Sequence, residues 1–364
     1  MPRCTITGFG TWVPNDIVRN DAWPPQFGQR AAETAALRTF NDIEPPRDAE
    51  SARLLLEHLS REASDPFLGA TQRHRADPTI TDEYAEACAA QQAMHDADVG
   101  ADDIDVVLTH SVVPDQVSIS TSGAICKRLG IRNVLGFAVE SACASGLAQL
   151  FVAKALIESG QARHVLLTQS HLMLRAVPFE HPATPGLGDA ASAMVVSADR
   201  PGLEVVDVWG VTQGEYCKAV AWRRATLEPD SAEQPWWRAS EHDFMLSTHD
   251  RAGVKTLMRD TVQLGYETVA EVCSRAGVEL HELAALLSVQ PRGFIPRAIA
   301  ERLGLASERG VQTYDQVAHI GACGPVFNAV KARSLGLFVP DAWLAMYAQG
   351  AGFSRMAALL QVTT

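Results

Sequence analysis

The sequence has no long apolar run, no signal-like apolar start and no paired cysteines. No stretch of about 18 apolar residues occurs in its 364 residues, so we expect no membrane-spanning helix. The first residues lack the apolar core of a secretion signal. The seven cysteines are scattered without CxxC spacing, which predicts reduced thiols in the cytoplasm rather than a disulfide framework.

The chain also has fewer basic than acidic residues. The chain has 31 Lys and Arg against 43 Asp and Glu, a formal net charge of −12, which argues against nucleic acid and anionic membranes as main partners. A local basic patch could still bind an acidic carrier protein. No His or Cys spacing fits a metal site. Gly186-Leu187-Gly188 lacks the next glycine of a dinucleotide-binding motif.

What the sequence does contain is an alternation of strand-like and helix-like segments. Apolar residues make up 47% of the chain, enough for a large core. The predicted strands cover residues 4–10, 103–109, 133–139, 164–169, 190–197, 203–209, 283–290, 343–348 and 354–362. The predicted helices cover residues 49–62, 81–98, 120–129, 144–159, 254–276, 295–303 and 326–335. This alternation predicts an α/β fold with mixed sheets, and the similar order in both halves indicates an internal duplication.

The most informative residue is Cys143. It lies in a run of small residues between a predicted strand and a predicted helix, so we expect it at a helix N-terminus. There, free N–H groups and the helix dipole favour the thiolate, which is the nucleophile in covalent acyl chemistry. A buried structural cysteine is the alternative for this segment alone.

Other segments fall in register with Cys143. They are Gly188-Asp189 at the start of a strand, Gln290-Pro291-Arg292 at the end of one, residues 299–305, His319, and the late loop 350–352. With these segments the chain resembles the thiolase superfamily and, within it, β-ketoacyl-acyl-carrier-protein synthase III, over nearly its whole length.

The resemblance implies a thiolase-like five-layer αβαβα fold of two pseudo-repeated halves, residues 1–200 and 201–364, and a homodimer. Relative to the family, residues from about 28 to 66 look inserted. A second insertion or lid, about 216–250, is polar and carries Trp222, Trp236 and Trp237.

For the site, the resemblance implies that Cys143 takes an acyl group from a coenzyme A or phosphopantetheine thioester and passes it on. The oxyanion hole would combine the N–H of Cys143 with that of Gly352 in the late loop. Arg73 and Arg292 are candidates for binding the phosphates of the donor. We expect no permanently bound cofactor and no metal.

The departures from the family pattern bear on the reaction. Condensing members carry His and then Gln where this chain has Val289 and Gln290, and Asn in the region where it has His319. The His and Asn stabilise the enolate formed when a malonyl thioester loses carbon dioxide. The changes favour plain acyl transfer, with His319 as general base and the Gln290 amide as a hydrogen-bond donor.

Three functions therefore stay open. The first is an acyltransferase of secondary metabolism that acylates a small-molecule acceptor from acyl-CoA or acyl carrier protein. The second is a decarboxylating β-ketoacyl synthase that uses His319. The third is a non-catalytic partner subunit of a heterodimer. Among other residues, we expect Asp189 to hold loop amides and Cys323 to pack in the core.

Overall fold

The computed structural model describes most of the chain. The described residues are 1–24, 27, 44–62, 65–116, 119–177, 179, 181, 183–217, 219–224, 244–247 and 250–363. Residues 28–43 of the first predicted insertion, and Trp236 and Trp237 of the second, lie outside them, as does the side chain of Trp222.

In the described part of the chain, ten strands form one mixed sheet in the order β12-β11-β13-β14-β8-β1-β7-β6-β4-β5. The strands of the first half are β1 (Cys4–Trp12), β4 (Val106–Ser111), β5 (Leu135–Ala138), β6 (His164–His171) and β7 (Ala190–Ala198). Those of the second half are β8 (Gly202–Thr212), β11 (Leu283–Ser288), β12 (Gly310–Val311), β13 (Trp343–Gly350) and β14 (Ser354–Thr363).

Each set of five strands has the same internal order. Numbered along the chain within its own half, each runs third, second, fourth, fifth, first across the sheet, and the two first strands, β1 and β8, pair antiparallel at the centre. The chain is therefore built from two pseudo-repeated halves. The residue boundary expected at 200/201 lies between β7 and β8.

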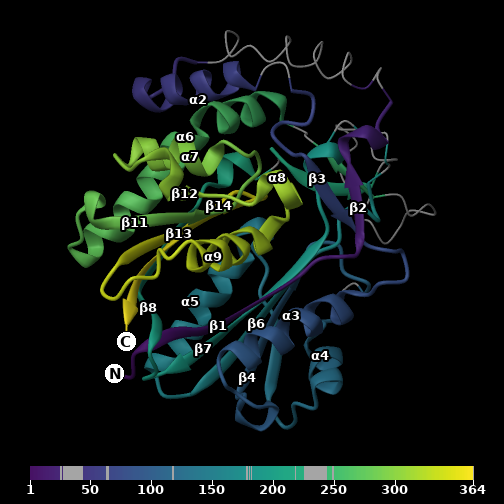
Figure 1. Cartoon of the computed structure of the whole chain (residues 1–364), viewed down its shortest axis with the longest axis vertical. Helices are drawn as coiled ribbons and strands as arrows, with labels where there is room; N and C mark the ends of the chain where they lie inside the picture. Colours follow the sequence, from purple (N-terminus) through teal and green to yellow (C-terminus); the bar gives the residue numbers. More distant parts are fainter. Residues whose placement is uncertain are drawn as a thin grey trace.

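Helices cover and separate the two halves of the sheet (Figure 1). The helices are α2 (Ala49–Arg61), α3 (Asp82–Asp96), α4 (Ser122–Leu129), α5 (Ser145–Glu158), α6 (Arg251–Ala276), α7 (Ile295–Arg302), α8 (Tyr314–Val317) and α9 (Gly324–Ser334). The helices α3 and α4 lie outside the first half, α5 and α9 lie between the halves, and α2, α6 and α7 lie outside the second. This is the five-layer αβαβα arrangement.

The middle layer explains the sequence of α5. The largest apolar core joins α5 and α9 to strands from both halves. A helix with sheet on two sides needs apolar residues around most of its circumference, which the run from Gly146 to Ile157 supplies. On the outer face, Gly10 in β1 lets α3 approach closely, because a Cβ atom there would overlap the carbonyl oxygen of Ala89.

The predicted elements agree with the observed ones, with ends displaced by a few residues. The strand expected at 103–109 spans Val106–Ser111, and the helix expected at 254–276 begins earlier, at Arg251. Two short pairs complete the fold: β2 (Asp16–Arg19) with β3 (Gln72–Arg75), and β9 (Ala221–Arg224) with β10 (Phe244–Ser247).

Candidate active site

Cys143 lies in a tight turn between β5 and α5. A 3-10 turn, Ala142–Ala144, leads directly into α5. Ala142 has a left-handed backbone with φ of 48°, and Glu140 Oε1 accepts the Ala142 N–H at 2.6 Å. The Ser145 hydroxyl accepts the N–H of Ser141 at 2.7 Å. These two side chains fix the turn that presents the thiol.

The structure brings Cys143 and His319 together from opposite halves of the chain. The Sγ atom of Cys143 lies 3.5 Å from Nε2 of His319, and Nδ1 of the same ring lies 3.2 Å from the main-chain oxygen of Gln290. A carbonyl can only accept, so Nδ1 carries the proton and Nε2 is left as the acceptor. The thiol of Cys143 therefore donates to His319.

Both members of this pair are electrically neutral at rest. Burial, with a smaller contribution from the Glu140 charge, raises the pKa of the Cys143 thiol to about 12. Burial lowers the pKa of His319 to about 4. The helix N-terminus was expected to favour the thiolate, and desolvation of the buried thiol opposes that effect. An imidazole within reach of the thiol can instead take the proton during attack.

The main chain of His319 is fixed by the Gly-Asp loop. His319 N–H donates to the oxygen of Gly186 at 2.9 Å, and the N–H of Gly188 donates to the oxygen of His319 at 3.0 Å. The carboxylate of Asp189 accepts from the N–H groups of Ala76 at 2.8 Å and Leu174 at 2.9 Å. Asp189 thus holds loop amides, as the sequence predicts.

A second imidazole packs against the first. The rings of His171 and His319 meet edge to face with centroids 5.5 Å apart, and His171 Nδ1 lies 2.8 Å from the oxygen of Gly188. Burial, and then the neighbouring His319, lower the pKa of His171 to about 3. His110 instead reaches Glu140, at 3.0 Å from Oε2.

Gln290 reaches the site through its main chain and not through its amide. The side chain is fully buried, and its amide bonds to Thr313, Ala318 and Asn328. The expected donation from this amide to a bound substrate is therefore wrong, because buried neighbours already use it. Val289 is also buried, in the central core, and supplies no imidazole.

A cavity of about 350 Å³ opens at Cys143. Its walls are mainly apolar and come from α2, α6, the segment after β11 and the loop between β13 and β14. The side chains from α2 and α6 are Leu55, Leu59, Val254, Leu257, Met258 and Thr261. These wall residues were not predicted from the sequence, because the local sequence does not show whether an apolar helix residue faces a cavity or the core.

The late loop lies against the turn that carries the nucleophile. Gly350, Ala351 and Gly352 line the same cavity as Cys143. A Cβ atom on Gly350 would overlap the carbonyl oxygen of Ser141, so only glycine permits this approach. The loop therefore lies beside the thiol, on the wall of the same cavity, and the role of Gly352 as an oxyanion donor stays a prediction.

A second cavity, of about 10 Å³, is also lined by Cys143. This volume is about that of a single water-sized probe. Its walls come from α5, β7, the start of α9 and β13, and include Leu147, Leu150, Met194 and Met346. Cys143 therefore lines both a roomy outer cavity and a tight inner one.

The two predicted phosphate-binding arginines have different surroundings. Arg292 lines the outer cavity with Cys143. Arg73 is fully buried, donates to the oxygen of Pro185 at 2.7 Å and to Asn20 Oδ1 at 2.8 Å, and lies over the Trp23 ring. Arg73 is therefore a structural residue, and its assignment to phosphate binding is wrong, because no phosphate can reach it.

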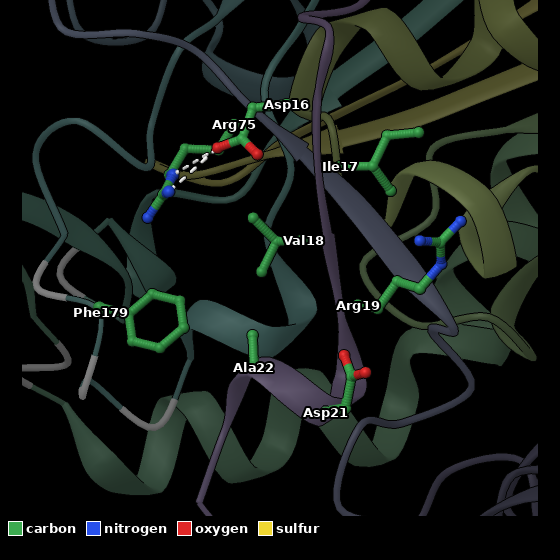
Figure 2. Close-up of a pocket in the computed structure, with 8 residues that line it drawn as sticks. All are labelled: Asp16, Ile17, Val18, Arg19, Asp21, Ala22, Arg75 and Phe179. Atoms are coloured by element: carbon green, nitrogen blue, oxygen red, sulfur yellow. Dashed lines mark hydrogen bonds and ion pairs between the residues drawn. The ribbon is translucent and has the colours of Figure 1, made fainter.

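A further pocket of about 270 Å³ lies beside β2 and β3 (Figure 2). There Arg75 pairs with Asp16, with Nη2 and Oδ2 3.0 Å apart, and Phe179 closes one side. None of the residues that line it lines the cavity at Cys143.

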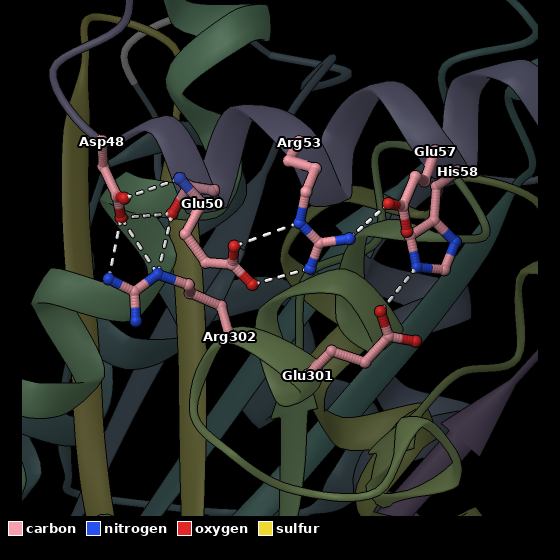
Figure 3. A network of polar contacts seen from close by, with 8 residues as sticks. Asp48, Glu50, Arg53, Glu57, His58, Glu301 and Arg302 are labelled. Carbon is pink, nitrogen blue, oxygen red and sulfur yellow. Dashed lines mark hydrogen bonds and ion pairs between the residues drawn. The ribbon is translucent and has the colours of Figure 1, made fainter.

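The helix α2 is fastened to α7 by polar contacts at both ends (Figure 3). Asp48, just before α2, pairs with Arg302 at 2.9 Å, and His58 Nε2 lies 3.1 Å from Glu301 Oε2. The His58 ring also stacks on Phe294, a cavity residue, with centroids 5.5 Å apart. These contacts hold one wall of the cavity in place.

The described residues contain no group of three His, Cys, Asp or Glu side chains placed to hold a metal ion. Among them, no helix combines the length and apolar character needed to cross a bilayer. Cys323 is buried at the start of α9, with its thiol directed at the oxygens of Gln169 (3.6 Å) and Ala190 (3.8 Å), which agrees with the expected packing role.

Comparison with known proteins places the chain in a family. Residues 137–214 match the sequence model of 3-oxoacyl-[acyl-carrier-protein (ACP)] synthase III, and residues 273–362 match that of the C-terminal part of the same enzyme. This chain is a β-ketoacyl synthase III-like protein of the thiolase superfamily. The first match contains Cys143 and the second contains His319.

Relatives of this synthase III-like chain match it over nearly its whole length. The β-ketoacyl-[acyl-carrier-protein] synthase III of Bordetella petrii is 25% identical over 356 residues, which covers 97% of this chain and 96% of the relative. The protein of the same name from Nitratidesulfovibrio vulgaris is 24% identical over 358 residues, covering 98% and 97%.

Solved structures show the same fold. The 3-oxoacyl-[acyl-carrier-protein] synthase III of Aquifex aeolicus has a TM-score of 0.76 at 19% identity and covers 98% of this chain and 99% of its own. OleA of Xanthomonas campestris, solved as a Cys-to-Ser variant with bound lauric acid and lauroyl-CoA, has a TM-score of 0.71 at 16% identity and covers 99% of each chain.

Proposed function

We propose that this synthase III-like protein is an acyltransferase that loads Cys143 from an acyl-CoA or acyl-carrier-protein thioester and passes the acyl group to a small-molecule acceptor. The observation that carries the proposal is the contact between the Cys143 thiol and His319 Nε2 at 3.5 Å, beside an open cavity. A thiol donating to an imidazole is the arrangement that nucleophilic acyl transfer requires.

The proposed reaction has two balanced steps. In the first, His319 takes the thiol proton while Sγ of Cys143 attacks the donor carbonyl; the donor thiolate leaves and takes that proton. In the second, the hydroxyl or amine of the acceptor attacks the Cys143 thioester and gives its proton to His319, which returns it to the departing sulfur. The N–H groups of Cys143 and Gly352 would stabilise each oxyanion, at about 3 kcal/mol per donor.

Acyl transfer is preferred to decarboxylative condensation because of Val289. The imidazole that the family resemblance places at this position is replaced by a buried alkyl group. His319, already hydrogen-bonded to the thiol, is the single imidazole that contacts it among the described residues. Two competing functions remain. Decarboxylation with His319 alone is supported by the presence of that imidazole at the thiol. A non-catalytic partner role is supported by the absence of an imidazole at Val289.

The cavities bear on the substrates. The outer cavity carries Arg292, which suits a phosphate or carboxylate, and we propose that the donor arm and the acceptor both use this route. The inner cavity of about 10 Å³ favours a short acyl group, since a longer chain would have to displace packed core side chains. Coenzyme A or phosphopantetheine is then a substrate, with no permanently bound cofactor.

A homodimer in the cytoplasm and a place in secondary metabolism complete the proposal. The strand β5 forms one edge of the ten-stranded sheet, and its Leu135 is 63% exposed. An exposed apolar edge strand favours pairing with a second copy. Size measurement by light scattering would test this part.

The proposed function is tested by intact-protein mass spectrometry after mixing with acyl- and malonyl-coenzyme A thioesters. We expect a stable acyl adduct that Cys143→Ala abolishes. His319→Ala should slow turnover by about 10²- to 10⁴-fold if it is the general base, and a loss below about threefold would remove it from that role.

The same experiment distinguishes the competing functions. Release of carbon dioxide from a malonyl donor, together with a condensed product, would establish the ketosynthase. No adduct with coenzyme A donors or carrier-protein donors would establish the non-catalytic partner.

A further inference from the structure

Behind the site lies a buried polar cluster that no substrate can touch. It consists of Gln290 just after β11, Thr313 just before α8, and Asn328 within α9. The exposed fractions of the three residues are 0%, 7% and 0%. A polar side chain that is buried without hydrogen-bond partners lowers the stability of a protein. The hydrogen-bond partners of these three residues therefore indicate which parts of the structure they position.

The three side chains are hydrogen-bonded to one another. Gln290 Nε2 donates to Thr313 Oγ1 at 3.0 Å, and Gln290 Oε1 accepts from the Thr313 N–H at 3.0 Å. Thr313 Oγ1 donates to Asn328 Oδ1 at 3.0 Å, and Asn328 Nδ2 donates to Gln290 Oε1 at 3.2 Å. Asn328 Nδ2 also donates to the oxygen of Ser288 at 2.8 Å, which ties the cluster to β11.

The cluster holds His319 from two sides. The main-chain oxygen of Gln290 lies 3.2 Å from His319 Nδ1. The Gln290 amide also donates to the oxygen of Ala318 at 3.2 Å, and Ala318 is the residue directly before His319. Ala318 has a φ of 56°, in the left-handed region that a residue with a side chain rarely adopts. The cluster thus fixes both the partner of the ring and the strained residue that aims it.

We infer that Gln290, Thr313 and Asn328 form an amide clamp that positions His319 for proton transfer from Cys143. The clamp holds the Gln290 carbonyl where it accepts from Nδ1, and so keeps Nε2 unprotonated and directed at the thiol. These three are positioning residues, since none of their side chains contacts Cys143. The inference rests on the proposed function only in taking the Cys143–His319 pair as the reactive pair.

The clamp is tested by removing the Thr313 hydroxyl while keeping the shape of the side chain. Thr313→Val deletes the oxygen that bonds both Gln290 and Asn328, whereas Thr313→Ser keeps it. The matched control is Thr268→Val on α6, another buried threonine, whose hydroxyl donates to the oxygen of Leu264 at 2.6 Å. Gln290→Met is a second clamp variant, used if Thr313→Val does not fold.

The first readout is the rate of Cys143 alkylation by iodoacetamide from pH 6 to pH 9. While His319 accepts the thiol proton, the rate should change little over this range. When the ring is misdirected, the rate should follow thiol ionisation and rise about tenfold per pH unit, because the thiolate is the nucleophile. The second readout is the separation of kcat from KM for acyl transfer.

For Thr313→Val and Gln290→Met we expect the steep pH profile and a kcat lowered about 10- to 100-fold, with KM within about twofold, as small misplacements of catalytic groups produce. Thr313→Ser should recover both readouts, and Thr268→Val should match the wild type. A folded clamp variant that keeps the flat profile and the wild-type kcat would overturn the clamp. A steep profile in the wild type, unchanged by His319→Ala, would instead remove the reactive pair and the proposed function.

Discussion

Glu140 is the charged residue that most directly opposes formation of the thiolate at Cys143. Its carboxylate accepts the N–H of Ala142 at 2.6 Å and contributes to the raised pKa of the Cys143 thiol. Glu140 thus holds the turn and, through its charge, makes the sulfur harder to ionise. Its position three residues before the cysteine is a signal that sequence reasoning could have used.

Replacing Glu140 by Gln should separate these two effects. The amide oxygen can still accept from Ala142, while the charge is lost, so the pKa of Cys143 should fall. We expect alkylation of Cys143 at pH 8 to be severalfold faster, because loss of the Glu140 charge makes it easier for the thiol to give its proton to His319. Glu57→Gln, an exposed carboxylate on α2, serves as the control, and a slower reaction would contradict this account.

At this scale, prediction from sequence was informative where the signal was local, although the catalytic roles of Cys143 and His319 stay predictions. Cys143 and His319 stand in small-residue segments, and the structure places them 3.5 Å apart. It failed for Gln290 and Arg73, whose surroundings come from distant residues. The amide partners of Gln290 lie 23 and 38 positions further along, and Arg73 is covered by Trp23. It also missed the burial that raises the thiol pKa, because burial is a property of the folded molecule.

At the scale of the elements, the loop after β13 depends on a single glycine. Gly350 lies so close to Ser141 that a methyl group there would push the loop away from the Cys143 turn. Gly350→Ala should lower acyl-enzyme formation by about 100-fold, since one oxyanion donor contributes that much or more. Gly214→Ala is the matched control, because nothing lies within 4 Å of its Cβ position. Equal rates for the two variants, measured by adduct mass, would exclude this role for the loop.

The helix α2 supplies the second prediction at this scale. Leu59 lines the outer cavity, whereas Leu56 on the same helix is 53% exposed. Leu59→Ala should raise KM for the acyl donor about three- to tenfold through lost apolar contact, at about 0.8 kcal/mol for each buried methylene. Leu56→Ala should leave KM unchanged. Steady-state kinetics on both variants would check this, and equal KM values would place the donor elsewhere.

For the whole molecule, the buried acid Glu86 should shape the dependence of stability on pH. Glu86 on α3 accepts from the hydroxyls of Thr168, Ser111 and Ser170, and burial raises its pKa to about 8. Its folded pKa thus lies above its unfolded value. Its contribution to the free energy of unfolding is complete at low pH and is lost as the pH rises towards 8.

Glu86→Gln should remove that loss. Between pH 5 and pH 8, the free energy of unfolding of the wild type should fall relative to that of the variant, by up to about 1.4 kcal/mol per pH unit. The Tm of the wild type should fall with it. The buried imidazoles act in the lower part of this window, because their lowered pKa values remove stability as the pH falls from 6.5. Both proteins contain these imidazoles, so the difference between the two Tm curves reports Glu86. Thermal unfolding of both proteins across this range is the measurement, and parallel curves would show that Glu86 does not titrate there.

The fold as a whole was the most predictable level. Among the described residues, strand and helix periodicity predicted nine of the ten strands of the large sheet and seven of the eight α-helices, because both patterns depend on residues close in sequence. The four short strands β2, β3, β9 and β10 were not predicted. The pairing of β1 with β8 and of β14 with β8 joins segments nearly 200 and 150 residues apart, and no local pattern states such pairings. These pairings were therefore not predicted from the sequence.

The shared strand order has a consequence for how the chemistry of this protein can change. Cys143 and His319 occupy corresponding connections, each between the third strand of its half and the following middle-layer helix. In the proposed reaction, one copy of the connection makes the covalent bond and the other transfers protons. The two tasks therefore lie in separate halves of the chain. A chimera that takes residues 201–364 from a condensing relative would keep this nucleophile and acquire a different reaction.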